Sequence, residues 1–171
     1  MGSVARALTF DFVGAASVSQ AMWSFEEAGV WVTASAWAGG VARNVHRDSF
    51  GLGVSFSGDR ALEGPSQQID GRGQVETLSL VFSEPVTLKE AVLSYWEAND
   101  EMLLLVDGEA DRLSGRVFDF SAPGQDDDYK LRSIEVERVS HTEVPPASIP
   151  EPGSIIMVGV GLVGLAMRRR R

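Results

Sequence analysis

The chain has 171 residues, which suits one domain of ordinary size followed by a short tail. Its formal net charge is −9, and residues 1–150 alone carry 11 basic and 23 acidic residues, a charge of −12. This balance argues against nucleic acid as a partner, because affinity for nucleic acid depends on basic contacts to phosphate. It favours solubility outside the cell. The chain contains no cysteine, which excludes disulfide bonds and thiol catalysis.

The start of the chain resembles the end of a leader peptide without its apolar region. Met1 to Leu8 contain no apolar stretch of the roughly 7 to 15 residues that a signal peptide requires. Ala5-Arg6-Ala7 nevertheless fits an A-x-A cleavage site. We interpret residues 1–7 as the remnant of a leader or cleavage region and expect an apolar region upstream. A chance match in an alanine-containing start is the alternative.

The first half of the body shows the period of half-buried strands. Residues 8–13 and 28–37 alternate between two faces, and Gly39-Gly40 interrupts the second segment. Residues 18–27 are compatible with either a strand or a loop. Residues 50–56 form the next candidate. The residues predicted to share a face are Leu8, Phe10 and Phe12 in the first segment, and Val30, Val32, Ala34 and Ala36 in the second.

Glycines and a long polar connection mark the middle of the chain. Gly51 and Gly53 indicate a bulge or a close approach of another backbone. The connection from Ser57 to Gly73 is rich in turn-forming residues. Because so long a loop is unusual in a compact domain, we expect it to wrap one end of the domain, where a bound ion would order it.

The second half repeats the strand pattern. Ser83-Glu84-Pro85 predicts a turn, and Asp107-Gly108 predicts a tight hairpin. Leu78, Leu80 and Phe82 point inward before the first turn, with Glu76 on the same face, and Ile134 and Val136 point inward near the end of the domain. The predicted strands are residues 74–82, 86–96, 101–106, 112–120 and 129–139.

Eight or nine short strands with regular turn signals predict an all-β fold. We expect an antiparallel two-sheet sandwich of jelly-roll kind over residues 8–139. A proline-rich linker over 140–152 follows, and then a short C-terminal hydrophobic helix with an arginine tail over 153–171.

The C-terminal run from Ile155 to Met167 carries no charged side chain. Counted from Gly153, it offers about 15 residues and roughly 22 Å of helix, less than the roughly 30 Å hydrocarbon core of a bilayer. The four residues Arg168, Arg169, Arg170 and Arg171 follow, and by the positive-inside rule they stay in the cytoplasm. We interpret the run as a temporary membrane handle. A buried core helix with a basic tail is the alternative.

Ile149-Pro150-Glu151-Pro152-Gly153-Ser154 precedes the apolar run. With the arginines, these parts resemble the PEP-CTERM sorting signal of exopolysaccharide-producing Gram-negative bacteria. The resemblance implies export, recognition by the membrane protease-transpeptidase exosortase, cleavage near Pro-Glu-Pro, and release or attachment at the cell surface. It assigns Pro150, Glu151, Pro152 and Gly153 to the sorting motif, and Arg168 to Arg171 to the cytoplasmic stop.

The body itself is similar to a group of exosortase-dependent surface proteins that carry a β-domain ahead of the sorting tail. This second resemblance spans about 60 to 80 residues and rests on ordinary strand and turn chemistry. Its motifs are Gly51-Leu52-Gly53-Val54, Ile69-Asp70-Gly71-Arg72-Gly73, Glu76 to Ser83 and Val86-Thr87-Leu88.

Three kinds of side chain are candidates for chemistry in the body. Aromatic rings could stack on sugars, paired carboxylates could hydrolyse a glycoside, and acidic loops could hold a structural calcium ion. Each has a simpler reading as core, surface or strand-end residues. The aromatic set is Trp23, Trp31, Trp37, Trp96 and Tyr95; the hydrolase set is Glu76, Asp70, Asp100 and Glu97; the calcium set is Asp70, Asp107, Asp111, Asp126, Asp127 and Asp128.

The two histidines, His46 and His141, lack the spacing of a metal motif and are predicted to lie on the surface. No catalytic or metal-binding residue is assigned, and no cofactor is expected. We therefore expect an exported, non-catalytic cell-surface or extracellular-matrix protein. Its transient partners are exosortase and, through Ile155 to Met167, the inner membrane. A module that binds exopolysaccharide is the alternative, and a secreted glycan hydrolase is a weaker third.

Overall fold

The computed structural model describes residues 6–55 and 67–139. They belong to the first of two compact units, Met1–Val139; the second is Ser140–Arg171. Every regular element in the described residues is a β-strand, so the all-β prediction is confirmed. The strands are β1 (Ala7–Asp11), β2 (Val18–Gln20), β3 (Met22–Glu27), β4 (Val30–Ala38), β5 (Val41–Asp48), β6 (Gly51–Ser55), β7 (Ile69–Asp70), β8 (Glu76–Ser94), β9 (Leu103–Val106), β10 (Ser114–Ser121) and β11 (Asp128–Arg138).

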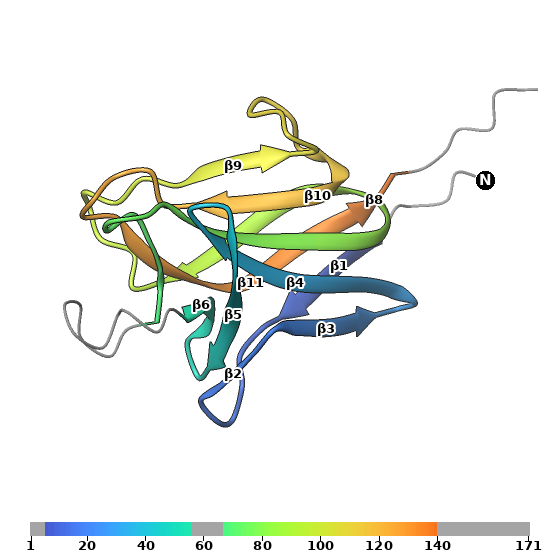
Figure 1. Ribbon diagram of the computed structural model, residues 1–171. Coiled ribbons are helices and arrows are strands. Elements are labelled where there is room, and N and C mark those ends of the chain that lie inside the picture. The colour runs from blue at the N-terminus through green and yellow to red at the C-terminus, as the bar shows by residue number, and fades with distance from the viewer. Residues whose placement is uncertain (1–5, 56–66, 140–171) are drawn as a thin grey trace, which may run out of the picture. The chain divides into compact units, whose positions relative to one another are not determined.

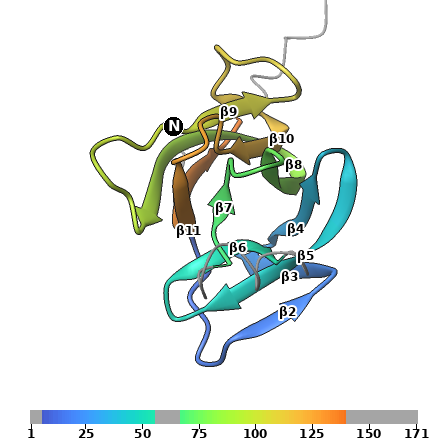
Figure 2. The same cartoon turned by 60° about the vertical axis from the view of Figure 1, so that its left-hand side comes forward.

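The strands form one sheet that closes into a small barrel. Their order is β1-β11-β6-β5-β4-β8-β10-β9, and β8 also pairs with β11, which joins the two sides of the sheet. All the pairings are antiparallel. Figure 2 shows β11, β6, β5, β4 and β8 arranged around the core. The predicted two-sheet sandwich is therefore realised as one continuous sheet whose walls face each other.

The long strand β8 accounts for the closure. Its first part pairs with β4, and its second part pairs with β11. The turn predicted at Ser83-Glu84-Pro85 is wrong, because the strand continues through these residues and curves (Figure 1). Pro85 lies where the strand changes its partner, and its carbonyl accepts a hydrogen bond from the Val139 N–H at 3.3 Å. A proline without an N–H is tolerated at such a break in the ladder.

Three tight turns have two central residues each; two of them connect hairpins of neighbouring strands, and the third closes the bridge between Val106 and Glu109. Both central residues have positive φ angles in Ala28-Gly29 (48° and 82°), Gly39-Gly40 (55° and 79°) and Asp107-Gly108 (51° and 85°). This is the geometry of type I′ turns, which suit the twist of antiparallel strands. The turns predicted at Gly39-Gly40 and Asp107-Gly108 are confirmed. The strand predicted from residue 28 begins two residues later, at Val30.

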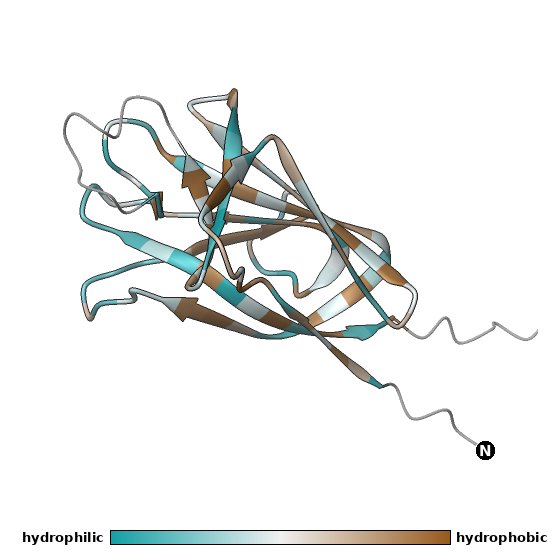
Figure 3. Ribbon diagram, turned by 90° about the horizontal axis from the view of Figure 1, so that it is seen from below, coloured by the Kyte–Doolittle hydropathy of each residue, from teal (hydrophilic) through white to brown (hydrophobic). Residues whose placement is uncertain are grey.

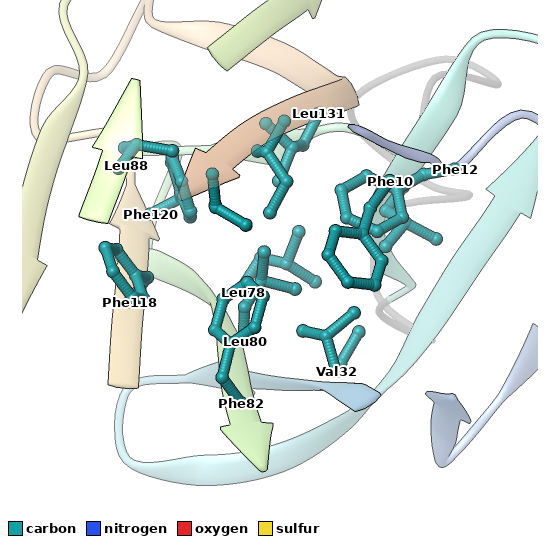
Figure 4. Packing of buried hydrophobic residues seen from close by; sticks show 14 of the residues in the cluster. Phe10, Phe12, Val32, Leu78, Leu80, Phe82, Leu88, Phe118, Phe120 and Leu131 are labelled. Carbon is teal, nitrogen blue, oxygen red and sulfur yellow. The ribbon is translucent and has the colours of Figure 1, made fainter. Parts of the chain in front are cut away.

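The predicted inward faces form the core. Leu8, Phe10 and Phe12 are at most 3% exposed. Phe82 lies between Phe10 and Phe118, with ring centroids 5.7 and 5.4 Å apart in edge-to-face geometry (Figure 4). Hydrophobic and hydrophilic residues alternate along several strands (Figure 3). The other predicted inward residues are also buried: Val30, Val32, Ala34, Ala36, Leu78, Leu80, Ile134 and Val136.

The close approach predicted for the glycines of β6 is confirmed. A side-chain Cβ on Gly53 would lie 2.0 Å from the carbonyl oxygen of Gln67. The Val54 N–H donates to the Gln68 carbonyl at 3.1 Å, which holds the two segments together. Glycine is therefore required for β6 to pack against the residues leading into β7.

Other segments differ from the sequence prediction. The ambiguous segment 18–27 forms β2 and β3, and 41–48, for which no strand was predicted, forms β5. The predicted loop from Ser57 to Gly73 contains the short strand β7. The predicted linker over 140–152 and helix over 153–171 lie outside the described residues.

Candidate functional site

The predicted sorting residues also lie outside the described residues. They are Pro150, Glu151, Pro152 and Gly153, with the arginines at 168–171. Within the described part of the chain, the side chains with chemical potential form three groups: an aromatic face, a buried ionic network, and the acidic residues of one set of loops.

The aromatic face is built on β4. Trp31 and Trp37 are 52% and 43% exposed, whereas the residues that alternate with them are buried. The prediction that both indoles lie opposite the valines is thus confirmed. Because they are six positions apart on one strand, the two tryptophans stand roughly 20 Å apart along β4.

Small hydroxyl and apolar side chains surround these tryptophans. We define the β4 outer face as the two tryptophans and the residues that share their side of β3, β4, β8, β10 and β9, which are neighbours in the sheet (Figure 1). Its members are Met22, Ser24, Glu26, Trp31, Thr33, Ser35, Trp37, Thr77, Ser79, Val81, Leu103, Leu105, Val117, Asp119 and Ser121. The face carries two carboxylates and no basic side chain.

Cross-strand hydroxyl pairs order this face. The hydroxyls of Thr77 and Ser121 are 2.9 Å apart, and those of Ser24 and Thr33 are 3.4 Å apart. At the margin, the backbone N–H of Trp31 donates to Ser83 Oγ at 3.0 Å. The Arg116 guanidinium donates to the Ser83 carbonyl at the same edge. The face thus combines exposed aromatic rings with hydroxyl groups held in fixed positions.

The structure places the other predicted aromatics elsewhere. Trp23 is half-buried, donates its indole N–H to the Val45 carbonyl at 3.3 Å, and lies under the Arg47 guanidinium at 5.0 Å. Tyr95 and Trp96 follow the end of β8, where their rings contact Phe50 and Tyr129 respectively. Only two of the five predicted aromatics therefore belong to the β4 outer face.

The ionic network joins β5 to β11 and consists of His46, Asp48 and Lys130. The Lys130 side chain is 3% exposed, and its ammonium lies 2.5 Å from Asp48 Oδ2. Asp48 Oδ1 accepts the N–H of Phe50 at 2.8 Å. The Tyr95 ring covers the ammonium at 5.9 Å. Asp48 therefore neutralises a charge that the barrel wall encloses.

His46 lies beside this ion pair. Its Nε2 is 3.5 Å from Asp48 Oδ2 and 3.2 Å from Ser17 Oγ, and its Nδ1 is 2.9 Å from Ser19 Oγ. A serine, an imidazole and a carboxylate in sequence resemble a hydrolase triad. The 3.5 Å separation is long for a hydrogen bond, however, and Lys130 holds Asp48 more closely. The imidazole thus ties β2 to β5.

Burial and the ammonium set the protonation of the network. Burial lowers the pKa of His46 below its usual 6.5, and the charge of Lys130 lowers it further, against the opposing effect of Asp48. Burial alone would raise the pKa of Asp48, but the hydrogen bonds from Lys130 and from the Phe50 N–H outweigh it, so that pKa is lowered. At neutral pH the network therefore contains a neutral imidazole and an ion pair.

The surface location predicted for His46 is wrong, since His46 is 3% exposed. The error follows from the missed strand β5, whose residues His46 and Asp48 are two apart. Lys130 gives no sequence signal, because it comes from β11, 82 positions from Asp48. His141 lies outside the described residues.

Three of the four carboxylates proposed for glycoside hydrolysis, Glu76, Asp70 and Asp100, bind backbone N–H groups. Glu76 is 3% exposed, as its inward position predicts, and its Oε2 accepts the Asp70 N–H at 3.2 Å. Asp70 Oδ1 accepts the N–H of Arg72 at 3.0 Å. The structure also brings Glu97 and Asp100 together, with the Glu97 N–H donating to Asp100 Oδ2 at 2.5 Å. These contacts organise the ends of strands and loops.

The acidic residues proposed for calcium are similarly engaged. Asp127 accepts the N–H groups of Glu101 and Gly124, at 3.0 and 2.5 Å. Asp107 Oδ1 accepts the N–H groups of Arg116 and Val117, at 3.1 and 3.0 Å. Within residues 6–55 and 67–139, no group of three or more histidine, aspartate or glutamate side chains is placed to hold a metal ion.

The pKa of Asp128, the first residue of β11, is raised. Burial raises its pKa, and the neighbouring Asp100 and Glu97 carboxylates add to the effect. Arg72 and a 2.7 Å hydrogen bond from Gln68 Nε2 oppose it. Asp111 and Asp126 remain exposed. Asp107 and Asp127 are therefore the acidic residues of this set that hold neighbouring backbone segments with two hydrogen bonds each.

Comparison with known families adds the evidence that the described residues cannot give. Residues 148–171 match the model of the PEP-CTERM protein-sorting motif. The chain carries a PEP-CTERM sorting signal. The match contains all the predicted sorting residues and the arginines, and it supports exosortase-dependent sorting of an exported protein with a cell-envelope or surface fate.

No curated protein and no solved structure matches the chain. Among residues 6–55 and 67–139, no helix is long and apolar enough to cross a membrane. The apolar run of the PEP-CTERM signal, Ile155 to Met167, lies outside those residues. The sorting assignment thus rests on residues 148–171.

Proposed function

We propose that the protein is an exported cell-surface or extracellular-matrix protein that exosortase cleaves near Pro150-Glu151-Pro152. The match of residues 148–171 to the PEP-CTERM motif carries this proposal. The run from Ile155 to Met167 holds the precursor in the inner membrane of a Gram-negative bacterium, and Arg168 to Arg171 remain in the cytoplasm. Cleavage then releases the β-barrel or attaches it at the surface.

The barrel itself is non-catalytic in this proposal. Three of its four candidate carboxylates, Glu76, Asp70 and Asp100, accept structural hydrogen bonds from backbone N–H groups. His46 and Asp48 likewise hold strands and an enclosed ammonium. These contacts support a role in stability, because a general acid or base must reach a substrate proton.

A triple alanine substitution at Pro150, Glu151 and Pro152 tests the processing step. The variant is expected to accumulate as a full-length precursor in the membrane fraction, because exosortase no longer recognises it. Alanines at Pro145 and Pro146, in the same linker, provide the control and should leave processing unchanged. Immunoblotting of cell fractions measures the precursor and the mature protein. Normal maturation of the triple variant would refute the proposal.

Carbohydrate binding is the second candidate function. It is favoured by the two exposed tryptophans of β4, Trp31 and Trp37, which stand among hydroxyl side chains. Aromatic faces pack against apolar faces of ligands, while nearby polar groups fix their orientation. An exported protein with such a face is suited to contact the exopolysaccharide of its own cell surface.

A further inference from the structure

The two exposed tryptophans of the β4 outer face stand in line along one strand. Trp31 and Trp37 lie on the same side of one strand, roughly 20 Å apart. Thr33 and Ser35 lie between them on that side, and both are partly exposed. The tryptophans and hydroxyls therefore follow a line along β4.

This line suits an extended chain of sugar rings. The apolar face of a pyranose ring can pack on an indole, and its hydroxyl groups can exchange hydrogen bonds with serine and threonine. A single ring could not contact both tryptophans at this separation. Both anchors can therefore be used together only by a ligand of several rings lying along the strand.

The charge of the face restricts the ligand further. Its charged members are Glu26 and Asp119, and Arg116 at the margin is held by the Ser83 carbonyl. Residues 1–150 carry a net charge of −12. Such a field repels a polyanion at a distance, and the face offers no basic side chain to bind carboxylate, sulfate or phosphate groups.

We propose that the β4 outer face binds a neutral, extended polysaccharide, which lies along β4 and packs on Trp31 and Trp37. This inference rests on the carbohydrate-binding function proposed above and names its ligand class and its anchors. Acidic polysaccharides are excluded as ligands of this face. A second copy of the chain is a different occupant, and the test below separates it.

Affinity electrophoresis of the full chain in native gels tests the proposal. The gels contain hydroxyethylcellulose, galactomannan or xylan as neutral probes, alginate as an acidic probe, or no polymer. Trp31→Ala and Trp37→Ala are compared with Trp96→Ala, which removes an indole that is 45% exposed and lies off this face. Thermal melting of each variant verifies folding, and truncation of these exposed rings should leave it nearly unchanged.

At least one neutral polymer is expected to retard the wild-type chain, while alginate does not. Each single substitution at Trp31 or Trp37 should weaken the retardation about tenfold, the loss of roughly 1.4 kcal/mol. The double substitution should abolish it, and Trp96→Ala should retain it. Loss of retardation in Trp96→Ala, with the other two variants unaffected, would overturn the placement of the ligand.

The remaining outcomes distinguish the two proposals. Retardation by alginate that depends on Trp31 and Trp37 would preserve carbohydrate binding and overturn the neutral ligand. No retardation by any polymer would overturn both. Self-association that rises with protein concentration and disappears in the double variant, without retardation by any polymer, would assign the face to a second copy instead.

Discussion

Lys130 holds a positive charge in the wall of the barrel, where its side chain is 3% exposed. An enclosed ammonium is stable only with a close counter-charge, and Asp48 supplies it at 2.5 Å. The pair also joins residues 82 positions apart, on β5 and β11. Single side chains in this network therefore have consequences for the whole barrel.

Asp48→Ala should lower the free energy of unfolding by about 3 to 5 kcal/mol, because it leaves Lys130 buried without a counter-charge. The double variant Asp48→Leu with Lys130→Met removes both charges and should recover most of this loss. Urea denaturation followed by tryptophan fluorescence measures both values. A loss below about 1 kcal/mol in the single variant, the range of exposed ion pairs, would contradict the role assigned to Asp48.

His46 predicts a pH dependence with a definite sign. Its pKa is below 6.5 in the folded protein, so the unfolded chain binds the proton more readily. Stability should be complete above pH 6.5 and should fall as the pH drops below it. The lowered pKa of Asp48 makes a separate contribution to stability, which is lost at pH values below about 4.

Denaturation midpoints between pH 5 and 8 measure this effect. His46→Gln should flatten the dependence in that range, whereas His141→Gln, outside the described barrel, should preserve it. Stability that rises on acidification from pH 7 to 5 would contradict the sign derived for His46.

At the scale of elements, local chemistry determined which features could be predicted. Gly39-Gly40 and Asp107-Gly108 predict turns because their residues suit positive φ angles. The turn predicted at Ser83-Glu84-Pro85 is wrong. Proline occurs in turns, but here it lies in a continuous strand, at the point where β8 changes its partner from β4 to β11. β5 was missed because its residues 41–48 lack a clear alternation, with both Val45 and His46 buried.

Gly53→Ala should destabilise the barrel by about 1 to 3 kcal/mol, the usual cost of overpacking. The new methyl group would lie 2.0 Å from the Gln67 carbonyl oxygen, so β6 and the segment before β7 must separate. Gly14→Ala is the matched control, since its nearest neighbour is a side-chain atom, Arg47 Cγ at 3.1 Å, and not a backbone atom. Equal melting temperatures for the two variants would contradict the required close approach.

At the scale of the molecule, the tail and the barrel differ in how much their sequence reveals. The PEP-CTERM signal could be predicted because its parts are contiguous, and the match at 148–171 confirms it. The exposed positions of Trp31 and Trp37 could be predicted because both follow the two-residue alternation of a single strand. The ionic network could not, because three-dimensional pairing alone brings Lys130 to His46 and Asp48.

The first and last strands of the barrel lie side by side. Ala7 pairs with Glu137, so the first and last strands of the unit, β1 and β11, begin and end at the same edge (Figure 1).

Mass analysis of the mature protein tests the central claim most directly. The full chain is expressed in a host that contains exosortase and in the same host without it. With exosortase, the mature protein should end near Pro150-Glu151-Pro152 and lack the apolar run and Arg168 to Arg171. Without exosortase, the C-terminus should remain intact. An intact C-terminus in both hosts would contradict sorting through the PEP-CTERM signal.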